Sequence, residues 1–86
     1  MYSITFLNPF NTSVQLEVHA GNQANCDQNG TTFNSSLGAN GTYVLDTSEN
    51  VVCWRRTANP GTPGSPLGGW GTFAPDNINT PTTIQL

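Results

Sequence analysis

The chain has 86 residues, of which 35% are hydrophobic and only 8% are charged. A chain of this length forms one small domain, assigned here to residues 1–86, whose core alone gives marginal stability. The net charge of −3, with only two basic residues, excludes nucleic acid as a partner, because binding a polyanion depends on many Lys and Arg contacts. No apolar run reaches the roughly 20 residues that a membrane span needs.

Two alternating segments open the chain. Apolar and hydroxyl residues alternate over 2–6, and apolar and polar residues alternate over 14–18, so each segment predicts a half-buried strand. Asn8 and Pro9 supply turn chemistry between them, and we expect the two strands to form an antiparallel pair. Because strand-like alternation starts at Tyr2, we expect no signal peptide within this chain. The following Gly-, Asn- and Gln-rich residues predict a loop.

Five more strands are predicted, at residues 31–37, 42–46, 51–57, 70–73 and 82–86. Asn40-Gly41 is a strong hairpin signal between the first two of them. The Pro/Gly-rich segment 57–71 predicts a loop, because that density of Pro and Gly leaves no room for a helix or a long strand. The pattern indicates an all-β fold: a small antiparallel β-sandwich, immunoglobulin-like or jelly-roll-like, of six to seven short strands with one disulfide.

The segment 51–57 combines a cysteine, a tryptophan and both basic residues of the chain. Side chains alternate between the two faces of a strand. One face therefore carries Val51, Cys53 and Arg55, and the other carries Val52, Trp54 and Arg56. Both faces begin apolar and end in a guanidinium, which predicts a buried central strand whose end emerges into a loop.

Cys26 and Cys53 are the only cysteines. They are too far apart for a C-x-x-C redox motif, and one histidine adds too little for a zinc site. We therefore expect a disulfide that joins the two layers of the sandwich and adds about 3–4 kcal/mol of stability. A structural disulfide implies an oxidising compartment, so the predicted location is secreted or extracytoplasmic.

The sequence offers little for catalysis. His19 is the only histidine, and alternation places it beside Glu17 on a polar strand face, as expected for a surface residue. The sequence contains no Gly-x-Ser-x-Gly motif that would expose a serine nucleophile. Residues 27–30 resemble the start of a calcium loop but lack the later acidic ligands, so turn chemistry is the preferred interpretation. We expect no enzyme activity, no cofactor and no metal.

Four residues are predicted to bind a ligand: Arg55, Arg56, Trp70 and Trp54. An exposed indole offers a flat apolar face to a sugar ring, and a guanidinium holds a carboxylate, a sulfate or a pair of hydroxyls. The site would lie at the end of the sandwich formed by the arginines and the 57–71 loop, with Trp70 as its platform.

The same residues also have structural interpretations. Trp54 is expected to pack over the disulfide, as the core tryptophan of immunoglobulin domains does. Trp70 stands in a Gly-rich segment where burial and exposure are equally compatible with the sequence. The arginines are alternatively ion-paired with Asp46, Glu49 or Asp76, in which case they only fasten the long loop.

The leading functional prediction is a non-enzymatic, secreted or cell-surface binding module that recognises a glycan or another extracellular ligand. The alternative is a structural or self-assembling protein, a possible homo-oligomer, in which the first or the last strand pairs with another chain. Charges that normally guard sheet edges are scarce here. A third possibility is an inhibitor or toxin-like module that presents the Pro/Gly-rich loop to a protein target.

Overall fold

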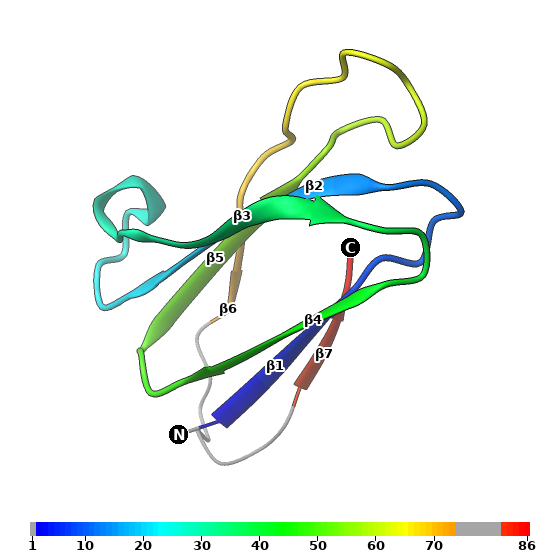
Figure 1. Ribbon diagram of the computed structural model, residues 1–86. Coiled ribbons are helices and arrows are strands. Elements are labelled where there is room, and N and C mark those ends of the chain that lie inside the picture. The colour runs from blue at the N-terminus through cyan, green and yellow to red at the C-terminus, as the bar shows by residue number, and fades with distance from the viewer. Residues whose placement is uncertain (1, 74–81) are drawn as a thin grey trace.

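The computed structural model describes residues 2–73 and 82–86, and these form seven strands and one short 3₁₀ helix (Figure 1). The elements are β1 (Tyr2–Leu7), β2 (Val14–Gly21), η1 (Cys26–Gln28), β3 (Thr31–Leu37), β4 (Thr42–Thr47), β5 (Val51–Arg56), β6 (Gly71–Phe73) and β7 (Thr82–Gln85). The prediction of a small all-β fold is confirmed, and each predicted segment contains a strand.

The strands form two layers, a three-stranded sheet in the order β4-β1-β7 and a four-stranded sheet in the order β3-β2-β5-β6 (Figure 1). Strand β5 lies between β2 and β6, as predicted for a central strand. Four of the five strand pairings are antiparallel. Strands β1 and β7 run parallel, so the expectation of a wholly antiparallel sandwich is wrong for this pair.

The first two strands do not pair with each other, which corrects the prediction made from their spacing. Strand β1 pairs with β4 and β7, whereas β2 pairs with β3 and β5 in the other sheet. The fully buried Asn8 stabilises the passage of the chain from one sheet to the other. Its Nδ2 donates to the carbonyls of Thr12, Leu37 and Gly38 at 2.9, 3.1 and 2.9 Å. The two N–H groups of one amide are thus shared among buried and partly buried acceptors from two connections that pass between the sheets.

The turn at Asn40-Gly41 is present, but it is not a hairpin. Asn40 has a φ of 58°, and the Gly41 amide donates to the Gly38 carbonyl at 2.9 Å. The turn joins β3 to β4, which belong to opposite sheets. The aromatic rings of Phe33 and Tyr43 stack with centroids 3.9 Å apart. Because each ring packs against the core, this stacking brings the two strands face to face rather than edge to edge.

The core lies between the two sheets and is built mainly by β1 and β2. The buried residues that form it are Tyr2, Ile4, Phe6, Val14, Leu16, Val18, Leu37, Leu45 and Val52. Those of β1 and β2 occupy alternate positions, so strict alternation in the sequence identifies the core face of these two strands. Phe6 lies near the middle, where its ring centroid is 6.2 Å from Tyr43 and 5.9 Å from Trp54.

The Pro/Gly-rich segment that follows β5 is more ordered than the sequence predicts. The Thr57 backbone bridges to Leu67, and the Ala58 amide donates to the Pro66 carbonyl at 2.8 Å. Positive φ angles at Gly61 and Gly64, which glycine adopts at no steric cost, help to reverse the chain. Residues 57–70 therefore form an irregular hairpin that projects beyond the end of the sheet (Figure 1).

Candidate functional site

A cleft of about 430 Å³ lies where β5 ends and the 57–70 hairpin begins. Its walls are formed by Trp54, Arg55, Arg56, Ala58, Gly68, Gly69, Trp70, Gly71, Gln85 and Leu86. All four residues predicted to bind a ligand thus line one concavity. Gln85 and Leu86 were not foreseen, because only the parallel pairing of β7 with β1 brings the end of the chain to this place.

The backbone of the cleft wall contains an irregularity of the β-bulge type. Trp54 pairs with Gly71, and Thr57 bridges to Leu67, so residues 55–56 face residues 68–70. One extra residue on the returning strand interrupts regular pairing and redirects side chains, and such bulges are frequent beside functional sites. The Gly68 amide still donates to the Arg56 carbonyl at 2.7 Å, which closes the base of the hairpin.

Trp54 faces the interior of the sandwich, not the disulfide as predicted. It follows Cys53 along β5, so the two side chains point to opposite faces of the sheet. Its indole packs against Phe6 and covers its cross-strand neighbour Gly71 so closely that a Cβ there would lie 2.5 Å from Cζ2. The half-buried ring therefore contributes to the core and to the cleft wall at once.

Arg55 lies on the outer face of the four-stranded sheet and binds Glu17. Its Nη2 lies 3.1 Å from Oε1 and 3.2 Å from Oε2. The two residues are direct partners in the β2–β5 register, which explains why Glu17 is chosen and the suggested Asp46 or Glu49 is not. Asp76, the third suggested partner, lies outside the described residues.

Trp70 is half-buried and held by two polar side chains. The Arg55 guanidinium carbon lies 4.5 Å from the centroid of its ring, and the His19 ring is tilted against it at 4.9 Å. These contacts fix the orientation of the indole at the edge of the cleft. A side chain positioned in this way loses little conformational freedom when a ligand binds.

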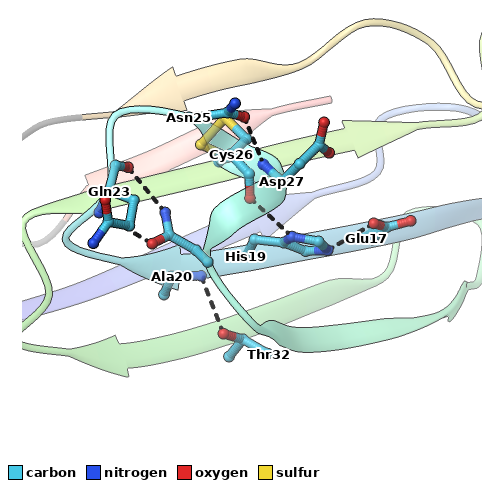
Figure 2. The surroundings of a disulfide bond; sticks show 10 residues. Glu17, His19, Ala20, Gln23, Asn25, Cys26, Asp27 and Thr32 are labelled. Carbon is cyan, nitrogen blue, oxygen red and sulfur yellow. Dashed lines mark hydrogen bonds and ion pairs between the residues drawn. A yellow bond between two sulfur atoms is a disulfide. The ribbon is translucent and has the colours of Figure 1, made fainter.

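His19 is buried, with 8% of its surface exposed, so its prediction as a surface residue is wrong. Its Nδ1 lies 3.1 Å from the Cys26 carbonyl, and its Nε2 lies 2.7 Å from Glu17 Oε2 (Figure 2). The Thr31 hydroxyl also contacts Nε2, at 3.2 Å. In a catalytic triad the acid and the nucleophile contact opposite ring nitrogens. Here both contact the same one, so these groups lack the geometry of a triad.

The disulfide between Cys26 and Cys53 is present, with Cα atoms 5.8 Å apart. It does not join the two layers, because Cys53 points away from the core side of β5 that Val52 occupies. It instead ties η1 onto the outer face of the four-stranded sheet. This attachment places the connection between β2 and β3 over His19, which accounts for the burial of that residue (Figure 2).

The side chains of the disulfide loop are engaged in turn chemistry. The Asn25 side chain accepts from the Asp27 amide at 3.1 Å. The buried Asn29 accepts from the Gln23 amide and donates to the Gln23 carbonyl, both at 3.1 Å. Within the described residues no cluster of three His, Cys, Asp or Glu side chains is suited to hold a metal ion. In the same part of the chain no helix has the length and apolar character to cross a membrane.

Arg56 lies on the inner side of β5, beside Phe10. Its guanidinium carbon is 5.0 Å from the centroid of the Phe10 ring. Its Nη1 donates to the carbonyls of Thr57 at 2.6 Å and Ala58 at 3.4 Å. No carboxylate of residues 2–73 or 82–86 forms an ion pair with it. The two arginines of the cleft therefore differ in electrostatic state, since Arg55 is paired and Arg56 is not.

No family model matches this chain, and neither the curated proteins nor the solved structures contain a significant match to it.

Proposed function

We propose that this protein is a non-enzymatic binding module that recognises a glycan, or another extracellular ligand, in the cleft at the end of β5. The observation that carries the proposal is the meeting of both tryptophans and both arginines of the chain in one concavity. A volume of about 430 Å³ lies within the range of small-molecule sites. Indole faces suit sugar rings, and guanidinium groups suit hydroxyls and anions.

The other walls suit a hydroxyl-rich ligand as well. Gly68 and Gly69 carry no side chains, so a ligand can approach the backbone closely, and the Gln85 amide adds both a donor and an acceptor. The disulfide supports a secreted or cell-surface location, because such bonds persist in oxidising compartments.

Tryptophan fluorescence offers a direct test. Because both tryptophans line the cleft, we expect a bound oligosaccharide to change the intrinsic emission, and calorimetry with the same sugar to give a dissociation constant. Trp70→Ala and Arg56→Ala should each weaken binding about tenfold or more. Val44→Ala, which alters an exposed apolar side chain on β4, is the matched control and should bind as the wild type does.

Unchanged affinity in both cleft variants of a protein that binds would remove the proposed site. A native chain that binds no oligosaccharide in a broad array would count against glycan recognition itself.

A second candidate function, self-association through a sheet edge, is favoured by strand β3. This edge strand carries no charged residue and no proline over Thr31–Leu37, so it lacks the usual protection against pairing with another chain. The first strand is not available for this role, because β1 lies between β4 and β7. The last strand, β7, is an edge of the described three-stranded sheet. Sedimentation velocity across a concentration series tests the idea: a monomer at every concentration rejects it.

A further inference from the structure

The cleft contains one guanidinium that the described residues leave electrically uncompensated. Arg55 is neutralised by Glu17, whose carboxylate is buried beneath it on the outer face. Arg56 uses Nη1 for the carbonyls of Thr57 and Ala58, and its Nε and Nη2 donate to no described residue. Backbone carbonyls orient a guanidinium but do not cancel its charge. Arg56 therefore brings a net positive charge and spare donors to the cleft wall.

No acidic side chain of the described residues forms an ion pair with Arg56. Asp46 and Glu49 lie at the β4–β5 end of the sandwich. Asp27 lies in η1, which the disulfide holds on the outer face of the four-stranded sheet, whereas Arg56 lies on the inner side of β5. The length of β5 separates Glu49 from Arg56, and a strand rise of about 3.3 Å per residue makes that about 17 Å. This is roughly twice the Debye length of about 8 Å at physiological ionic strength. Arg56 thus presents a guanidinium that no side chain of residues 2–73 or 82–86 ion-pairs, although the chain has a net charge of −3.

We infer that the cleft takes an acidic sugar, and that Arg56 binds the ring carboxylate or sulfate of this ligand; the inference rests on the proposed function and specifies its ligand class. A guanidinium binds both groups through paired, charge-assisted hydrogen bonds. The stacking over Phe10 and the bonds to the hairpin base hold the side chain in place before a ligand arrives. A neutral sugar would partly desolvate Arg56 and offer it only hydroxyl acceptors, which do not cancel its charge. The site therefore discriminates in favour of an anion.

Calorimetry with matched pairs of oligosaccharides tests this inference. The members of each pair differ only in a ring carboxylate or only in a sulfate ester, as glucose differs from glucuronic acid and galactose from its sulfate. We expect the acidic member to bind about ten- to a hundredfold more tightly than the neutral one. Comparison of the carboxylate pairs with the sulfate pairs identifies which anion is preferred.

Two variants of one residue supply the control. Arg56→Gln keeps donors but removes the charge, so the preference for the acidic member should disappear. Arg56→Lys keeps the charge but loses the planar fork, so it should retain a reduced preference. The ratio of the two affinities is the readout, because a general disturbance of the hairpin weakens both members of a pair alike. If Arg56→Gln fails to fold, the salt dependence of the wild type supplies the test. Its affinity for the acidic member should fall as the salt concentration rises to about 0.5 M.

The outcomes separate this inference from the proposed function. Equal affinity for both members of every pair, or a preference that survives in Arg56→Gln, overturns the acidic ligand and leaves glycan binding intact. Salt-independent affinity for the acidic member overturns it equally. Binding of neither member by the native chain rejects glycan binding, and the acidic ligand with it.

Discussion

Removal of the disulfide should destabilise the protein by about 3.6 kcal/mol. The perturbation is the double variant Cys26→Ala/Cys53→Ala, which frees the unfolded chain from a crosslink between residues 27 positions apart. The chain-entropy model assigns a loop of that length about 12 cal/mol/K, which gives this figure at 25 °C. Release of η1 also weakens the contact between the Cys26 carbonyl and His19, adding about 1 kcal/mol. Small domains have total stabilities of only about 5–15 kcal/mol, so the loss is a large fraction.

The assay is equilibrium unfolding in urea followed by tryptophan emission, with the free energy of unfolding extrapolated to water. The single variant Cys26→Ala is the control, because it breaks the crosslink while the Cys53 sulfur stays in its fully buried position. It should account for most of the loss. If the double variant is less than about 1 kcal/mol less stable than the wild type, the bond constrains neither the unfolded chain nor η1, and the expected loss is contradicted.

Three further results are expected. Asn8→Ala should reduce the free energy of unfolding by about 3 kcal/mol, because it leaves three buried or partly buried carbonyls without their donor. Asn8→Asp should be no more stable than Asn8→Ala, since a carboxylate cannot donate to these carbonyls. Unfolding in urea at the wild-type stability would contradict this expectation. Gly71→Ala should lower the free energy of unfolding by about 1–3 kcal/mol and shift the fluorescence emission of Trp54, because the new Cβ would collide with that indole. Gly69→Ala is the control: its Cβ meets nothing within 4 Å, so its stability and its emission should match the wild type. Burial raises the pKa of Tyr2 above 10.0, so the contribution of its neutral side chain to stability should be complete below pH 10 and lost as pH rises through the folded pKa. Tyr2→Phe should therefore lose less stability at alkaline pH than the wild type, as measured by urea midpoints. The same dependence of the midpoint on pH in both proteins would contradict this expectation.

The strands could be predicted from the sequence because alternation is a local property. Residues 2–6 and 14–18 each alternate between apolar and polar side chains, and each lies within an observed strand. Strand pairing is not local, and a strand's pattern does not say which partner it will choose. The assumption that neighbours in sequence also pair failed for β1 and β2, because the buried amide of Asn8 stabilises a crossing between sheets that no periodicity reveals.

The candidate site was predictable to the extent that its residues are close in sequence. Trp54, Arg55, Arg56 and Trp70 lie on the two arms of one hairpin, so a local argument was enough to group them. The contacts of Arg55 and His19 were not predictable in the same way. Alternation along β2 places His19 beside Glu17, but it does not reveal the pairing of Arg55 with Glu17, which depends on the register between β2 and β5, or the burial of His19 under the loop that the disulfide holds.

The parallel pairing of β1 with β7 has a consequence for how the chain acquires its fold. Ile4 lies opposite Thr82, so the central strand of one layer gains its second neighbour only from a segment almost the whole length of the chain away. Closing so long a separation costs chain entropy before any contact compensates for it, and proteins dominated by such pairings fold in milliseconds to seconds. A nascent chain would therefore carry β1 with one side open until residues 82–85 emerge, so the three-stranded layer is completed only after the other described strands have been synthesised.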